Sequence, residues 1–65
     1  MTIVTRCLMI KGHYVRRMMD VETFKKHARR TNASKRHNYY VTRTIGAFIY
    51  GMDRETFIKY SVDYQ

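Results

Sequence analysis

Residues 20–36 run DVETFKKHARRTNASKR, and they predict one short helix that continues into a basic loop. Asp20 is a suitable N-cap, because its carboxylate can accept hydrogen bonds from the unpaired amides of the first helical turn. Glu22 adds negative charge at the positive end of the helix dipole. A narrow apolar stripe at helical spacing comprises Val21, Phe24, Ala28 and Thr31. We therefore expect a helix over residues 20–32 and a loop over residues 32–38.

The face opposite this stripe is cationic. Lys25 and Arg29 are four residues apart, and so are Lys26 and Arg30, so a helix would place like charges one turn apart. Each such pair costs an isolated helix roughly 0.2–0.5 kcal/mol. A helix that only needed solubility would alternate these cations with Glu. A surface of a single sign therefore indicates an anionic partner.

Length and charge define one small basic domain over residues 1–65. A chain this short buries only about 60% of its unfolded surface, so a homodimer or a larger partner is expected to support the fold. The net charge is +8, and residues 11–36 hold nine Lys and Arg against two acids, which gives a net of +7. The charge is therefore a patch and not a general means of solubility.

The cysteine content and the apolar runs limit the cellular setting. Cys7 is the single cysteine, and its place in an apolar run predicts a small buried side chain. The longest apolar runs, residues 7–10 and 45–50, are too short to span a bilayer. The N-terminus lacks the basic-then-apolar layout of a signal peptide. We therefore expect a cytoplasmic protein with no membrane partner.

Strand composition precedes the helix. Residues 2–10 and 13–19 are rich in β-branched and apolar side chains, and the Lys-Gly pair at residues 11–12 predicts a two-residue hairpin loop between them. In that register Arg6 lies opposite Arg17, which is unfavourable without an anion or acid between them. Both faces of the hairpin are substantially apolar, so we expect one face to be covered and the other to be partly covered.

A second strand region and a second helix follow. Residues 39–50 have strand composition, and Gly46 marks a bulge or bend that can divide them into two strands. Residues 19–26 (MDVETFKK) and 52–59 (MDRETFIK) are identical at six of eight positions, 33 residues apart. This similarity predicts a second capped helix over residues 53–60. It has two interpretations, a duplicated strand–helix unit or an independent return to a good capping sequence.

These elements predict an α+β domain with the order ββαβ(β)α. A small antiparallel sheet, made of the β-hairpin and one or two further strands, would carry both short helices on one face. Residues 61–65 would form a tail or a short edge strand.

The basic patch is the strongest functional signal. Its candidate binding residues come from a strand end, the helix and the loop: Arg16, Arg17, Lys25, Lys26, Arg29, Arg30, Lys35 and Arg36. Such a surface neutralises phosphates and releases counterions. The adjoining Tyr39 and Tyr40 can stack on unpaired bases, although packing in the core is the more common role for tyrosines. The alternative for the cations is a solvated face that complements the negative end of the helix dipole.

Metal binding and catalysis have little support in the sequence. The possible ligands lack the paired close spacing of a zinc site: Cys7, His13, His27 and His37. His13 adjoins a basic turn but has no positioned partner that would make it a general base. With no phosphate-binding glycine loop, nucleophile elbow or carboxylate pair, we expect a protein that is not an enzyme and holds no cofactor.

Two interpretations of function remain open. The first is a small non-enzymatic nucleic-acid-binding protein, whose cationic helix and adjoining basic loop contact phosphates. The second is a small protein-binding regulator or inhibitor that docks its basic face on an acidic or nucleic-acid-like surface of a larger enzyme complex. A protein partner would also use apolar anchors, for which the candidates are Met9, Met18, Phe48 and Tyr50. Small size and a richness in Met and Tyr are compatible with an accessory protein of a phage or mobile element.

Overall fold

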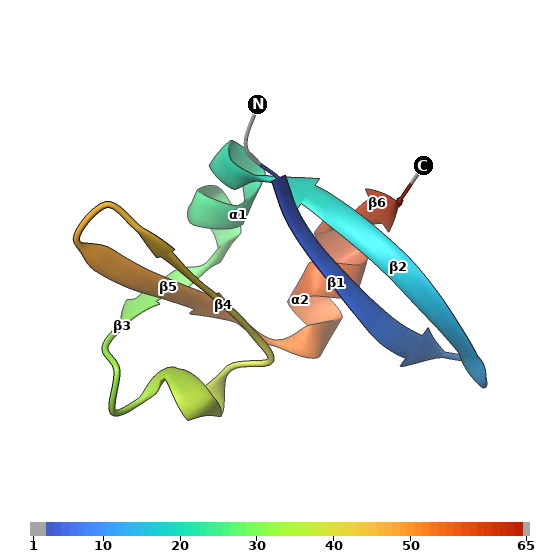
Figure 1. Cartoon of the computed structure of the whole chain (residues 1–65), viewed down its shortest axis with the longest axis horizontal. Coiled ribbons are helices and arrows are strands. Elements are labelled where there is room, and N and C mark those ends of the chain that lie inside the picture. The colour runs from blue at the N-terminus through green and yellow to red at the C-terminus, as the bar shows by residue number, and fades with distance from the viewer. Residues whose placement is uncertain (1–2, 65) are drawn as a thin grey trace.

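The computed structural model describes residues 3–64, which form an α+β domain with two α-helices (Figure 1). The elements are β1 (Ile3–Ile10), β2 (His13–Asp20), α1 (Val21–His27), β3 (Arg29–Thr31), the 3-10 helix η1 (Arg36–Asn38), β4 (Val41–Ile45), β5 (Phe48–Met52), α2 (Arg54–Tyr60) and β6 (Val62–Asp63). The predicted first strand also included residue 2, and the predicted tail included residue 65; both lie outside the described residues. No helix within residues 3–64 has the length and apolarity needed to cross a membrane.

The strands form two three-stranded antiparallel sheets, and the expectation of a single sheet is wrong. Sheet A has the order β1-β2-β6, and sheet B has the order β3-β5-β4. Figure 1 shows the two sheets on opposite sides of the molecule, with α2 between them. The β1–β2 loop has two residues as predicted, and Arg6 lies opposite Arg17.

Arginine side chains occupy several of the carbonyl groups along β1, the free edge of sheet A. Arg6 donates to the carbonyl of its neighbour Thr5 at 2.7 Å. Arg54 donates to the carbonyl of Met9, and Arg43 reaches that of Ile3 at 3.5 Å. Acceptors that hold a guanidinium are not open to another strand, so the edge is blunted.

The predicted helix over residues 20–32 is too long, because α1 ends at His27. Ala28 donates its amide to the carbonyl of Phe24 at 2.8 Å and then takes an extended conformation. Residues 29–31 pair as β3 with β5. These residues therefore satisfy their backbone groups in a sheet, and the tertiary pairing overrides their helical preference.

The second half of the chain follows the prediction more closely. Gly46, with a φ of 64°, begins the turn that divides residues 39–50 into β4 and β5. Asp53 caps α2, which spans Arg54–Tyr60 as expected. The last predicted segment contains a short edge strand, β6.

The two halves of the chain repeat one ββαβ unit, and they exchange their last strands. β3 of the first half pairs with β5 of the second, whereas β6 of the second half pairs with β2 of the first. The registers correspond after a shift of 33 residues: Arg17 lies opposite Asp63 in sheet A, and their equivalents Tyr50 and Arg30 lie opposite each other in sheet B. This correspondence favours a duplicated unit over two independent capping sequences.

The first strands of the two halves are also similar. Val4 lies opposite Met19 in sheet A, and Val41 lies opposite Met52 in sheet B. Each valine begins the same tripeptide, Val-Thr-Arg. The repeat therefore includes the strands as well as the helix caps.

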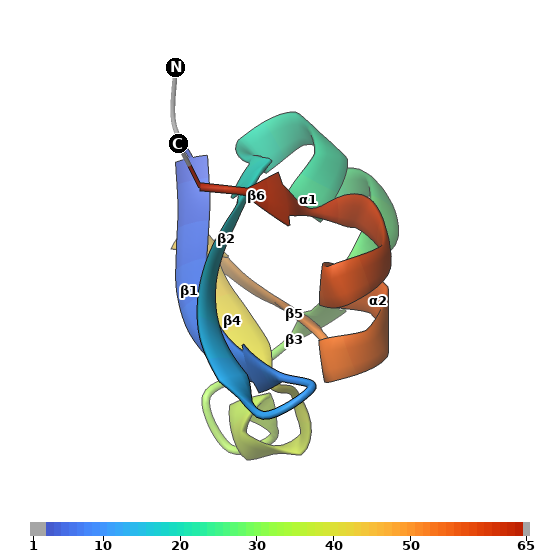
Figure 2. The same ribbon diagram turned by 90° about the vertical axis from the view of Figure 1, so that its right-hand side faces the viewer.

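The core consists mainly of equivalent residues from the two halves. It comprises Val4, Leu8, Met19, Phe24, Val41, Met52 and Phe57, all of them buried. Figure 2 shows α1 and α2 side by side, and their last residues, His27 and Tyr60, stack with ring centroids 3.7 Å apart. Phe24 and Phe57 have no exposed surface, as expected for rings that face the sheets.

Cys7 is exposed, so the prediction of a buried thiol is wrong. In sheet A the helices cover the face that carries Val4 and Leu8. Cys7 lies on the opposite face, because successive residues of a strand point to opposite sides. The exposed Met9 and Tyr14 share this outer face, which therefore presents apolar side chains to solvent.

Candidate nucleic-acid interface

Arg17 belongs to the fold and not to an open binding surface. Its side chain is 19% exposed and donates hydrogen bonds at the C-terminal end of α2. The acceptors are the Ser61 hydroxyl at 2.8 Å, the Ser61 carbonyl at 2.6 Å and the Ile58 carbonyl at 3.2 Å. The Asp63 carboxylate lies 2.9 Å from the same guanidinium. The negative end of the helix dipole also stabilises a cation at this place.

Arg16 is exposed but lies apart from most of the predicted patch. It is on the outer face of sheet A, where its guanidinium lies over the Tyr64 ring at 5.4 Å. The structure therefore separates Arg16 and Arg17 from the other predicted cations.

The other six predicted cations follow one another along α1, β3 and the loop that leads to η1. We call them the basic strip: Lys25, Lys26, Arg29, Arg30, Lys35 and Arg36, all of them exposed. In Figure 1 the segments that carry them descend along one side of the molecule. The sequence has no acidic residue between Glu22 and Asp53. The strip therefore holds a positive charge that nothing within its own segment neutralises.

Arg29 and Arg30 point to opposite faces of sheet B, because they are neighbours in a strand. The prediction that they extend the helical cationic face is therefore wrong. Arg29 lies opposite Gly51, on which the Tyr39 ring packs so closely that a Cβ atom at Gly51 would be 2.5 Å from Tyr39 Cγ. Hydrogen bonds from Thr56 lower the pKa of Asp53, and the charge of Arg29 adds a smaller effect in the same direction.

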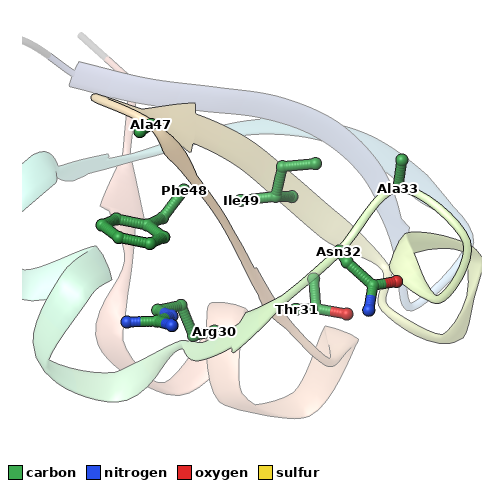
Figure 3. A pocket seen from close by; sticks show the side chains of 7 residues that line it. All are labelled: Arg30, Thr31, Asn32, Ala33, Ala47, Phe48 and Ile49. Carbon is green, nitrogen blue, oxygen red and sulfur yellow. The ribbon is translucent and has the colours of Figure 1, made fainter.

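Arg30 stacks on Phe48. Its guanidinium carbon lies 4.1 Å from the centroid of the Phe48 ring, which is within the range of a cation–π contact. Figure 3 shows this pair beside a hollow whose other wall is the start of the loop after β3. The hollow is lined by Arg30, Thr31, Asn32, Ala33, Ala47, Phe48 and Ile49.

The two halves of the repeated architecture differ electrostatically at equivalent strand pairs. In sheet A the cation Arg17 faces the acid Asp63 and forms an ion pair. At the equivalent place in sheet B the cation Arg30 faces Tyr50, which has no carboxylate. The same fold position is therefore neutralised in one half and left cationic in the other.

The two predicted stacking tyrosines have different surroundings. Tyr39 is half-buried against Gly51, which is a packing role. Tyr40 is exposed and adjoins the strip in the chain. Tyr40 is thus accessible to an unpaired base, whereas one side of Tyr39 is already occupied.

Sequence reasoning did not assign Phe48 to the basic surface. Phe48 was expected only as an apolar anchor for a protein partner. Its contact with Arg30 depends on the pairing of β3 with β5, and the predicted helix concealed that pairing. An exposed aromatic residue directly after the Gly46 turn was the available signal.

The described residues contain no group of three His, Cys, Asp or Glu side chains arranged as metal ligands. His13 lies at the hairpin end of β2, and His27 stacks on Tyr60. The chemistry available on this side of the molecule is therefore that of cations, hydrogen-bond donors and aromatic rings.

Comparison with known proteins finds no match: no family model, no curated protein and no solved structure is similar to the chain. The functional argument therefore depends on the surface of this molecule alone.

Proposed function

We propose that this protein is a small non-enzymatic nucleic-acid-binding module that contacts phosphates through the basic strip. The observation that carries the proposal is the exposed run of six cations on α1, β3 and the following loop, in a segment without acids. A phosphate backbone matches such a strip, because each cation that neutralises a phosphate releases a condensed counterion.

The arginines that bond within the fold support this proposal by contrast. Within residues 3–64 the described salt bridge joins Arg17 to Asp63. Arg6, Arg43 and Arg54 donate to backbone carbonyls of the fold. The fold therefore uses four arginines for its own stability and leaves the strip to solvent, where it is available to an external anion.

The test is a salt titration of binding to random duplex DNA and to single-stranded RNA. Log affinity should fall with log salt at about −0.9 per duplex phosphate neutralised, or about −0.7 on single strands. Replacing Lys26 and Arg30 with Gln should lower that slope by about one unit per lost contact and weaken all sequences alike. Circular dichroism should show that the variant still folds, because both side chains are exposed.

A matched control removes the same charge elsewhere. Lys11 and Arg16 are exposed on sheet A and its turn, away from the strip. Replacing both with Gln should change the salt slope by less than the strip variant does. Equal effects of the two variants would show that net charge, and not the strip, governs binding. Binding no tighter than about millimolar at low salt, where electrostatic attraction is strongest, would refute the proposal.

The alternative is a small protein-binding regulator, and the apolar outer face of sheet A favours it. Exposed side chains on this face include Ile3, Met9, Tyr14 and Val62. The predicted anchors Met9 and Phe48 lie on different sheets, so they do not form one surface. A partner recovered from a nuclease-treated lysate, lost with Tyr14→Ala and kept with Lys26→Gln, would favour this alternative.

A further inference from the structure

The hollow beside Arg30 is an open depression whose volume can admit a small ligand. Its volume is about 460 Å³, within the range of roughly 300–1,000 Å³ that ligand pockets occupy. The β4–β5 hairpin contributes Ala47, Phe48 and Ile49 to its lining, and the segment from Arg30 to Ala33 contributes the rest (Figure 3). Phe48 and Ile49 are neighbours in β5 and point to opposite sides of the strand, and Phe48 is the one that meets Arg30. Phe48 is 46% exposed, so its side chain is accessible to a ligand at this place.

The polar wall is fixed in position and presents hydrogen-bond donors. The Asn32 side-chain oxygen accepts from the Ser34 amide at 3.1 Å, the Ser34 hydroxyl at 2.7 Å and the Lys35 amide at 3.1 Å. These three bonds orient the Asn32 amide, so its NH₂ group is left to donate outward. The Arg30 guanidinium makes no hydrogen bond with the described residues and stacks on Phe48 instead.

We propose that this hollow binds one unpaired nucleotide of a single-stranded nucleic acid. Its base would stack against the Phe48–Arg30 pair, since every base has a π-face that fits an aromatic ring or a guanidinium plane. The Asn32 NH₂ group and the Arg30 guanidinium would donate to the base edge or to the adjoining phosphate. The proposal rests on the basic strip as the phosphate-binding surface, and it adds that single strands are the preferred ligand.

The repeat shows that the site is specific to one half of the molecule. The position equivalent to Phe48 is Val15, and the position equivalent to Arg30 is Asp63. An aliphatic side chain and a carboxylate cannot form this stacked pair. A general packing requirement of the fold would apply to both halves, so the stacked pair on sheet B is not explained by packing alone.

The experiment compares binding of a short single-stranded oligo(dT) and of its duplex with oligo(dA), by fluorescence anisotropy. Phe48→Ala should weaken single-strand binding about 5- to 150-fold, which is the measured range for loss of one base–aromatic stack converted to affinity. It should leave duplex binding and the salt slope unchanged, because no charge is lost. Arg30→Lys should also keep the slope and weaken the single strand, because a Lys ammonium lacks the planar face of Arg.

Two further variants keep the test decisive. Ala33→Leu fills the hollow from an exposed loop, and it should also weaken single-strand binding. It provides the test if Phe48→Ala fails to fold. Tyr14→Ala removes a ring that is 77% exposed on the outer face of sheet A, and it should have no effect on either ligand. A 2-aminopurine base in the single strand should lose fluorescence when the strand binds the wild type. It should keep its fluorescence with Phe48→Ala and with Ala33→Leu, the two hollow variants.

The outcomes separate this proposal from the proposed function. Equal affinity of wild type and of the folded hollow variants for the single strand overturns the nucleotide site and leaves the basic strip in place. Affinities for duplex and single strand that differ only as their charge densities predict would likewise overturn the nucleotide site and leave the basic strip in place. If neither ligand binds at low salt, the basic strip is not a phosphate-binding surface. The nucleotide site, which rests on the strip, then fails with it.

Discussion

A single arginine shows how the fold and the surface share the charge of this protein. Arg17 was expected among the phosphate-binding residues, since it lies next to Arg16 in a basic stretch. Alternation along β2 turns the two side chains to opposite faces, so Arg17 enters the region between sheet A and α2 while Arg16 remains outside. Neighbours in the sequence therefore have unrelated roles.

Replacing Arg17 should test this division. We expect Arg17→Ala to lower the free energy of unfolding by about 1–3 kcal/mol, because it leaves the carbonyls of Ile58 and Ser61 without their donor. Arg16→Ala should change the stability much less, since its side chain is exposed. Urea unfolding of both variants gives the comparison. An Arg17→Ala protein that is as stable as wild type but binds nucleic acid more weakly would contradict this assignment and place Arg17 in the binding surface.

The two helix caps make a prediction about acid. Hydrogen bonds from Thr23 lower the pKa of Asp20, and those from Thr56 lower the pKa of Asp53, below the ordinary value of 3.8. A carboxyl whose pKa is lower in the folded state stabilises the fold fully above its unfolded pKa, and this stabilisation is lost as the pH falls through the folded pKa. The stability of the protein should therefore decrease below about pH 4.

Asparagine variants isolate this effect. Asn is as good an N-cap as Asp but has no proton to gain in this range. The double variant Asp20→Asn, Asp53→Asn should therefore fold, and it should lose less stability than wild type between about pH 6 and about pH 3. Denaturant unfolding at the two pH values measures the difference. An unchanged acid sensitivity would assign it to the other carboxylates.

At the scale of elements, the two helices are held by one buried ring each. Phe24→Ala and Phe57→Ala should each cost about 3–5 kcal/mol, since both rings are fully buried. A domain of this length has about 3–10 kcal/mol of stability in total, so either variant should lose a large share of it, which urea unfolding followed by circular dichroism measures. Phe48→Leu is the control, because its ring is exposed. A Phe24→Ala protein as stable as the wild type would contradict the assignment of this ring to the core.

Local signals in the sequence predicted the elements that local forces determine. The Lys-Gly pair set the hairpin register of β1 and β2, and the Asp-x-x-Thr segments set the starts of both helices. The end of α1 carried no such signal, since no glycine follows His27. Ala28 becomes extended because β5 offers an edge to residues 29–31, and that edge is a tertiary feature.

The candidate site was predictable to the same extent. The chain order alone placed Lys25, Lys26, Lys35 and Arg36 in one basic segment, and each of them is exposed. The roles of Arg17, Arg30 and Phe48 depend on strands that are far apart in the sequence. Residue types could not reveal those pairings, because a one-residue change of register would send each side chain to the other face.

At the scale of the whole molecule, sheet A has one face covered by the core and one face open to solvent. The expectation of a homodimer or stable complex remains a prediction, and the outer face of sheet A is where we expect the contact. Sedimentation at micromolar concentration should show self-association or a bound partner. Met9→Lys should abolish it, because it places a charge in the apolar face. A monomer with a high melting temperature, unchanged by Met9→Lys, would contradict this expectation.

The exchange of last strands also determines when the protein can fold. Sheet B has its strands once residue 52 has been synthesised, but its inner face then lacks Phe57 of α2. Sheet A begins at residue 3 and must wait for residues 62–63 to provide β6. Such distant pairings require a large loop-closure entropy before they give any stabilisation. We therefore expect no stable partial product on the nascent chain, and we expect the protein to fold in one cooperative step only after residues 62–63 have been synthesised.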